Sequence, residues 1–456
     1  MAMKTRPLVR DLVVALVLAS ALPASAATGA VPDLGPQATV GRLPAGGTTI
    51  VEPLAGAPVA AIELWYRAPS TGFGQKPVPS LARLSAQIVA ASKPLVGQSL
   101  GELVKGVGGR LSITVYNESV EIAAVVPATL ARSVVKTMTT AYFAPVLDQT
   151  GFQIAQRDVV QEAVFESFNP ETVARDAVFG ALFVSGPEHF PALGDPRAIG
   201  AITLADARAY ATRAFRSQNA VLVVSGAVDR SVVSAAATGR PAEGYLAVAE
   251  TPVTTAIVPQ PPEPVTKAFD EPSGGYGWIG PAIADENAAT ALDFIADYLF
   301  GADTGYVTRA AAASDPDAFI VGQFVTLHDP GVLFVAYSGK NPAALRARIE
   351  ASVTLMQAPL PAADFNSALL AFRYHLLRDL QTPGELADNF GWYAVEGNLE
   401  YAPGASGDSG RYFRAIDALT PSFVASVAAK YLQHPAIVTL EPAKAAPSPS
   451  PSEAPK

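Results

Sequence analysis

Hydrophobic residues are distributed along the chain in two patterns, which predict two kinds of element. Short runs that are β-branched and either alternating or fully apolar, such as residues 60–66, 120–126 and 332–337, predict β-strands. Longer Ala- and Leu-rich stretches, such as residues 288–299 and 362–380, predict helices. Because the two kinds of element are interspersed, the sequence predicts an α+β fold, with helices packed on one face of a mostly antiparallel sheet.

The order of these elements occurs twice, at an offset of roughly 215 residues. The matching segments are residues 120–132 and 332–346 (a strand that leads into a helix opened by proline), residues 203–224 and 420–440 (a helix followed by a strand), and residues 60–66 and 275–279 (a weaker match between opening strands). Three matches in the same order at nearly one offset indicate a duplication. We therefore predict two homologous α+β domains.

The first residues have the features of a secretory signal peptide. A positively charged start is followed by an apolar stretch at residues 12–22 and by the small residues Ala24-Ser25-Ala26. The apolar stretch is too short to span a bilayer comfortably. We expect cleavage after Ala26, which predicts a periplasmic or secreted protein with no membrane span after cleavage.

A change of composition separates the two halves. Residues 251–265 are rich in proline, which predicts an extended, semi-rigid linker. The predicted division is a signal peptide (1–26), an N-terminal domain (27–250), the linker (251–265), a C-terminal domain (266–441) and an Ala/Pro/Ser-rich tail (442–456) that we expect to be disordered.

Composition narrows the possible functions. Of the 456 residues, 50% are hydrophobic and 16% are charged, which indicates a globular protein with sizeable cores. The net charge of −9 argues against nucleic-acid binding, which requires a basic surface. The absence of cysteine excludes disulfides, cysteine-ligated metal sites and a lipoprotein anchor.

Several segments, taken in order, resemble one known family. They are the helix at residues 79–89 with its lead Pro79-Ser80-Leu81-Ala82, the turn Gly108-Gly109 into a strand, the helical segment at residues 156–162, the loop at residues 189–196 and the closing strand from Asn219. In this order the segments are similar to those of the M16 metallopeptidases (insulinase, pitrilysin and mitochondrial processing peptidase). The resemblance extends from about Gly41 to Leu440.

The resemblance implies that the catalytic residues of that family are replaced. Its members hold zinc with two histidines of an H-x-x-E-H helix and a distal glutamate, while the motif glutamate activates water. The matching positions here are Arg83, Ala86 and Gln87, and the distal position aligns with Ala163, one residue after Glu162. Arginine stays protonated and cannot ligate zinc, and alanine cannot carry a proton. The resemblance therefore implies no catalytic residues, no metal site and no cofactor.

The second half carries a further pair of altered positions. Active M16 proteins use an arginine and a tyrosine there to hold the substrate, and these align with Ala312 and Phe319. Arg309 is an off-register candidate for the arginine, or simply a cation on a helix surface.

No other sequence motif supplies a replacement site. No H-x-x-E-H or H-E-x-x-H motif occurs anywhere in the sequence, and there is no nucleophile elbow, P-loop or dinucleotide fingerprint. No two histidines share a helix face; the four are His189, His328, His375 and His434.

The resemblance implies an exported M16 peptidase-like protein without its own zinc site. Its expected role is that of a non-catalytic subunit that forms a hetero-oligomer with an active M16 peptidase and helps to build the chamber in which peptides bind. Two alternatives stay open. One is an active zinc metalloendopeptidase of the M16 family, with zinc as cofactor. The other is a stand-alone peptide-binding or scaffold protein.

Overall fold

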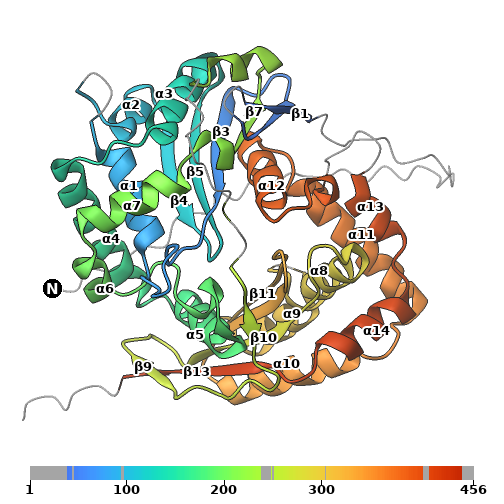
Figure 1. The fold of residues 1–456 in the computed structure, drawn as a ribbon. Helices are drawn as coiled ribbons and strands as arrows, with labels where there is room; N and C mark the ends of the chain where they lie inside the picture. The colour runs from blue at the N-terminus through green and yellow to red at the C-terminus, as the bar shows by residue number, and fades with distance from the viewer. Residues whose placement is uncertain are drawn as a thin grey trace, which may run out of the picture. The chain divides into compact units, whose positions relative to one another are not determined.

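The structure is a computed structural model that describes residues 38–43, 46–93, 97–237, 248, 251–302, 304–403 and 410–443. The predicted signal peptide, and the predicted tail from residue 444 onward, lie outside the described residues. Two sheets, each flanked by helices, confirm the predicted α+β class (Figure 1). None of the helices in the described ranges is both long and apolar enough to cross a bilayer.

The first half of the chain builds one sheet. Its strands, in spatial order, are β1 (Thr39–Arg42), β2 (Thr48–Pro53), β7 (Ala220–Gly226), β3 (Val59–Arg67), β5 (Ser119–Pro127) and β4 (Arg110–Val115). Neighbours are antiparallel except β2 and β7, which are parallel. Strand β3 lies between two partners and is buried on both faces, which explains its nearly continuous apolar sequence. Strand β4 forms one edge.

The second half builds a sheet of the same design. Its strands, in spatial order, are β11 (Phe319–Val325), β12 (Val332–Ser338), β10 (Ser273–Ile279), β13 (Ala436–Pro442) and β9 (Val265–Lys267). Again all neighbours are antiparallel except the last pair, β13 and β9. The order from β11 to β9 matches the order from β4 to β2, including the place of the parallel pair. The predicted duplication is therefore confirmed.

Each half packs its own helices on one face of its sheet. In the first half these are α1 (Leu81–Ala91), α2 (Leu100–Gly106), α3 (Ala131–Phe143), α4 (Gln149–Glu166), α6 (Pro196–Ala201) and α7 (Leu204–Ala214). In the second half they are α8 (Glu286–Phe300), α9 (Tyr306–Ser314), α10 (Pro342–Leu355), α11 (Ala362–Arg378), α13 (Gly410–Asp417) and α14 (Pro421–Tyr431). Short 3₁₀ segments are η1 (Ala128–Leu130), η2 (Pro187–His189), η3 (Ser217–Asn219), η4 (Arg230–Ala235) and η5 (Leu399–Tyr401).

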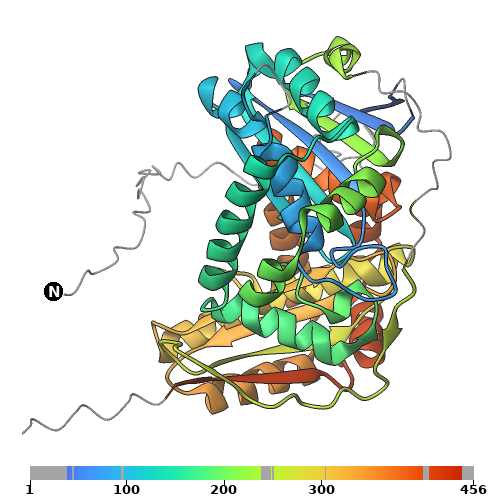
Figure 2. The ribbon, with the colours of Figure 1, turned by 60° about the vertical axis from the view of Figure 1, so that its left-hand side comes forward.

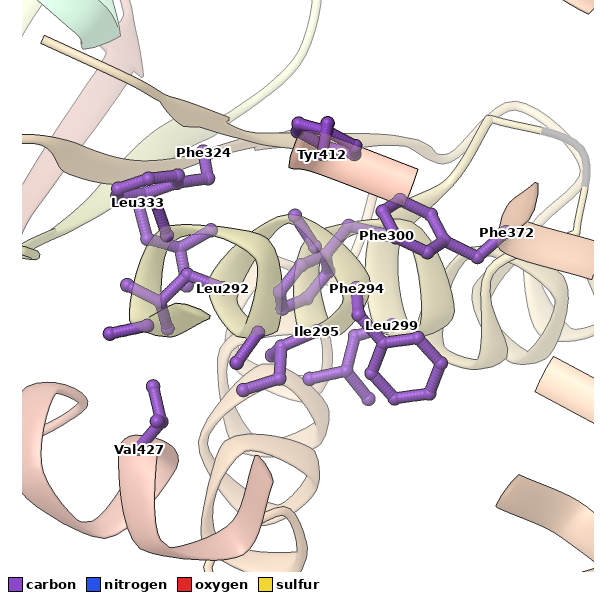
Figure 3. Close-up of a cluster of buried hydrophobic side chains, with 14 of the residues drawn as sticks. Leu292, Phe294, Ile295, Leu299, Phe300, Phe324, Leu333, Phe372, Tyr412 and Val427 are labelled. Atoms are coloured by element: carbon purple, nitrogen blue, oxygen red, sulfur yellow. The ribbon is translucent and has the colours of Figure 1, made fainter. Parts of the chain in front are cut away.

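Helix α8 lies at the centre of the second core. Figure 3 shows Phe294 and Leu299 of this helix among side chains from the sheet, such as Leu333, and from other helices, such as Phe372 of α11 and Val427 of α14. Because α8 is apolar on most of its surface, it is buried against several neighbours at once.

The remaining face of each sheet is covered by a helix from the other half. Helix α5 (Pro170–Leu182) packs on β10, β12 and β13, and α12 (Pro383–Val395) packs on β3, β7 and β2 (Figures 1 and 2). A Cβ added at Gly391 of α12 would lie 2.0 Å from Trp65 Nε1, so glycine permits this close approach. The sequence predicted helices on one face only; the exchange of helices accounts for the other.

The predicted linker takes part in this arrangement. Within residues 251–265, strand β8 (Thr254–Thr255) pairs with β6 (Phe183–Ser185), which directly follows α5. The division into domains at this segment stays a prediction, but the strands of the first main sheet all precede it in the sequence and those of the second begin at its last residue, Val265.

Candidate functional site

Helix α1 presents one polar pair on an otherwise buried surface. From Leu81 to Ala90 every residue is buried except Arg83 and Gln87, which are half-buried. These two positions are four residues apart and therefore lie on the same face of the helix. The N-cap residue before the helix, Ser80, is fully buried and has a left-handed backbone with φ 71°.

Helix α4 packs on this part of α1. Its carboxylate cap, Asp148, accepts a hydrogen bond from the amide of Gly151 at 2.6 Å. A buried stripe of Ala155, Val159 and Ala163, spaced by four residues, belongs to the first-half core that also contains α1. Glu162, which directly precedes Ala163, points its side chain toward α1 and contacts Arg83.

An ion pair joins the two helices at this point. Arg83 Nη2 lies 2.7 Å from Glu162 Oε2, and Arg83 Nε donates to Glu162 Oε1 at 3.4 Å. Arg83 Nη1 also donates to Gln87 Oε1 at 2.9 Å. The Arg83 side chain is only 13% exposed. A guanidinium held at two points by a carboxylate and at a third by an amide is a fixed internal cation.

The structure thus places the predicted positions as follows. Arg83 and Gln87 come together, and Glu162 on α4 is a partner of Arg83. Ala163, the residue aligned with the distal position, lies in the buried stripe and is not part of the group. Ala86 is fully buried, and its carbonyl accepts a hydrogen bond from the Tyr142 hydroxyl at 2.9 Å.

These residues do not fit a zinc ion. A zinc site needs at least three ligand atoms with free lone pairs, and here a carboxylate is the only side chain of the usual ligand types. The guanidinium carries no lone pair for a metal and repels a second cation. The side chain of Ala86, at the position of the catalytic base, has no group that could activate water.

A groove lies beside the ion pair. It has a volume of about 700 Å³ and is lined by Arg83 and Gln87, by residues of α2 and by residues 109–113, which enter strand β4. Strand β4 is the edge of the first sheet and pairs only with β5 among the described strands. An unpaired strand edge can accept an extended chain as an additional strand.

The aligned positions of the second half lie at the surface. Arg309 and Ala312 are exposed on α9, and Phe319, the first residue of edge strand β11, is 46% exposed. Among the described residues, no hydrogen bond or ion pair joins them to Arg83, Gln87 and Glu162, which we call the Arg83 group.

The histidines have separate local partners. His189 Nδ1 lies 2.6 Å from the Phe183 carbonyl, His328 Nδ1 lies 2.9 Å from the Glu396 carbonyl, and His375 Nδ1 lies 2.8 Å from Asp297 Oδ1. His434 lies in the turn before β13, with φ 48°.

Sequence analysis missed one cluster of carboxylates. Carboxylate oxygens of Glu63, Glu121 and Asp388 all lie within 4.8 Å of one another, and no other group of this kind occurs in the described part of the chain. The three residues come from β3, β5 and α12, so the cluster joins the two halves. Glu63 and Glu121 interrupt apolar strand sequences, and this was the available signal.

Burial controls the charge of this cluster. It raises the pKa of Glu63 well above the ordinary range and raises that of Glu121 to about 7, and in both cases a neighbouring carboxylate adds to the effect. Asp388 differs from the other two, because its side chain is exposed to solvent, and partial desolvation at the edge of the cluster raises its pKa. A hydrogen bond of 2.8 Å from Trp65 Nε1 to Glu63 Oε2 opposes part of the shift.

Solved structures share this fold. A protease from Helicobacter pylori is 17% identical and matches 90% of this chain and 100% of its own, with a TM-score of 0.75. An M16-like peptidase from Alicyclobacillus acidocaldarius is 14% identical (90% and 99% covered, TM-score 0.72). A peptidase M16 inactive domain from Pseudomonas fluorescens is 15% identical (89% and 98% covered, TM-score 0.71).

The sequence itself gives no such match. No protein-family model matches the chain, and no curated protein matches it significantly.

The matches to solved structures show that the chain has the fold of the M16 peptidases. The resemblance inferred from its sequence is confirmed at the level of the fold.

Proposed function

We propose that this chain is an exported, non-catalytic M16-like protein that acts as a partner subunit of an active M16 peptidase and helps to form its peptide-binding chamber. One observation carries the proposal: the guanidinium of Arg83 is bonded to both Glu162 and Gln87. In the M16 resemblance, Arg83 and Gln87 stand at the two histidine positions, and Glu162 directly precedes the distal position at Ala163. An internal cation thus takes the place that a metal ion would need.

An arginine in place of a metal ion is consistent with a stable local structure. The carboxylate of Glu162 has a charged partner, and the amide oxygen of Gln87 has a donor. Since the charges of Arg83 and Glu162 are paired, this part of α1 and α4 needs no metal to balance them. A fold kept intact without the means of hydrolysis supports a role in binding.

The groove beside β4 supports the binding of peptides. It combines an unpaired strand edge, which offers main-chain hydrogen bonds, with both signs of charge from Arg83, Glu102, Lys105 and Arg110. An extended peptide laid along β4 would gain main-chain hydrogen bonds whatever its sequence, and the charged side chains would select among peptides.

The remaining parts of the proposal rest on other observations. Export follows from the signal-like start of the sequence, and the similarity to an M16 inactive domain supports a role without hydrolysis. The partner role follows from the resemblance, in which subunits with and without the zinc motif close around one chamber.

The experiment uses the mature protein, residues 27–456, and an M16 peptidase with an intact H-x-x-E-H motif from the same organism. We expect a complex in size-exclusion chromatography with light scattering, and a changed rate of peptide cleavage by that peptidase. Arg110→Glu reverses a charge in the groove and should weaken peptide binding by about tenfold, while Arg157→Glu, on the exposed surface of α4, should not.

Three results would contradict the proposal in different ways. A mature protein that stays monomeric and leaves the peptidase unchanged, yet binds peptides, would be a stand-alone binding protein. A protein that cleaves peptides alone, with chelator-sensitive zinc, would be an active peptidase. Equal peptide binding by wild type and Arg110→Glu would exclude the groove.

A further inference from the structure

Helix α12 of the second half meets acidic side chains of the first half near its middle. Asp388 of α12 faces Glu63 of β3 and Glu121 of β5, and oxygens of the three carboxylates lie within 4.8 Å of one another. Glu63 is 3% exposed and Glu121 is 7% exposed. Asp388 lines a cavity of about 510 Å³ between the first-half turn at Tyr116 and helices of the second half.

The surroundings of this cluster supply hydrogen bonds but little positive charge. Trp65 Nε1 donates to Glu63, and Thr114 hydrogen-bonds to Glu121. Tyr116, whose ring stacks on Trp65, interacts electrostatically with all three carboxylates. Arg175 of α5 lines the same cavity, but among the described residues no cation lowers the pKa of any of the three carboxylates.

A second set of carboxylates lies where α12 ends. Glu396, which is 2% exposed, interacts with Glu118 of the first half. Glu188 of η2 is also buried and interacts with both of these carboxylates. The amide of His328 donates to Glu396 Oε2 at 2.7 Å, and Arg67 of β3 partly offsets the negative charge.

Sharing protons among the carboxyls favours these contacts. Ionised carboxylates a few ångströms apart repel one another, and burial adds a desolvation cost for the charges of Glu63 and Glu121, whereas Asp388 remains exposed to solvent. Protonated carboxyls lose this repulsion and gain a donor. The contact between α12 and the first sheet therefore takes up protons as it forms.

We infer that the packing of α12 on the first-half sheet is a pH-sensitive contact between the halves, closed when the facing carboxyls hold protons and loosened when they ionise. The device depends on the fold alone and does not require the proposed function to be correct.

The direction of the effect follows from the pKa shifts. Burial raises the pKa of Glu121 to about 7, and burial with neighbouring carboxylates raises that of Glu188 and of Glu396 to about 8. A group with a raised pKa in the closed state stabilises that state fully only below its ordinary pKa. This stabilisation is lost as pH rises toward the raised value. The contact should therefore weaken between about pH 4.5 and pH 8.

Hydrogen–deuterium exchange of the mature protein tests this inference. We expect the protection factors of α12 amides, corrected for intrinsic exchange, to fall by roughly a hundredfold from pH 5 to pH 8, because each pKa unit corresponds to a tenfold change in the opening equilibrium. Amides of α14, a helix that packs on α8 within the second half, serve as an internal reference. Glu121→Gln and, separately, Asp388→Asn should reduce the fall by about tenfold or more, and Glu263→Gln, in an exposed loop, should leave it unchanged.

Several outcomes would overturn the inference. One is protection of α12 that does not vary with pH, or varies equally in α14. Another is a wild-type slope in both Glu121→Gln and Asp388→Asn, which perturb a buried and a cavity-lining position respectively.

Discussion

In each half, a polar pair of side chains joins two equivalent helices, but the basic member of the pair lies on a different helix in the two halves. In the first half, Arg83 of α1 bonds Glu162 of α4; in the second, Asp297 of α8 bonds His375 of α11. Both members of the second pair follow those of the first by roughly 215 residues, the offset of the duplication. The cationic or imidazole partner lies on the first helix in one half and on the later helix in the other.

This comparison separates what the fold requires from what is particular to one half. A polar link between the two helices occurs in both halves, so the link itself belongs to the fold. The first pair lies beside a groove at edge strand β4, where Arg83 and Gln87 line a space of about 700 Å³. The Arg83 group is thus both a structural link and the wall of a candidate peptide site.

The largest expected effect on stability comes from a substitution that pushes α12 away from the first-half sheet. Gly391→Ala places a Cβ 2.0 Å from Trp65 Nε1, so α12 must shift away from the first sheet. We expect a loss of about 3 kcal/mol or more in the free energy of unfolding, measured by urea denaturation.

A glycine in the same helix provides the control. Gly384 has no atom within 4 Å of an added Cβ, so Gly384→Ala should be neutral or stabilise by about 0.5 kcal/mol. Equal effects of the two substitutions would mean that α12 does not pack on Trp65 as described.

Breaking the first polar pair should cost less. Glu162→Ala leaves the Arg83 guanidinium, 13% exposed, with Gln87 as its remaining partner. We expect a loss of about 1–2 kcal/mol by thermal or urea denaturation, reduced from the buried-pair value because Glu162 itself is partly exposed. Glu171→Ala, at an exposed site on α5, is a control with the same change of charge, and an equal loss there would remove the special role of Glu162.

The second polar pair should give the smallest effect. His375→Ala removes a hydrogen bond of 2.8 Å to Asp297, which is 21% exposed and can be solvated. We expect a loss of about 1 kcal/mol or less by the same measurement. A loss larger than that of Glu162→Ala would contradict the view that the first pair is the more tightly held of the two.

The sequence was sufficient to predict the elements and the duplication. The apolar run at residues 60–66 became the central strand β3, and the helix at residues 79–89 became α1 with a shift of two residues. These features depend on local patterns, which a sequence states directly.

The exchange of α5 and α12 and the carboxylate cluster could not be predicted in the same way. Both bring together residues far apart in sequence, such as Glu63 and Asp388, and local patterns carry no information on such pairs. The choice between Glu162 and Ala163 was also beyond the sequence. Neighbouring residues on a helix point about 100° apart, so an alignment error of one position changes which side chain reaches Arg83.

The central claim is that an internal cation replaces the metal in the first half. Titration calorimetry of zinc into the mature protein and into the double variant Arg83→His and Gln87→His tests it most directly. The variant combines two histidines with Glu162 and should bind zinc with a Kd of about 1 μM or tighter, without peptidase activity because Ala86 is unchanged. We predict no stoichiometric binding by the wild type. Stoichiometric, chelator-sensitive zinc in the wild type that is lost in Glu162→Gln would contradict the account.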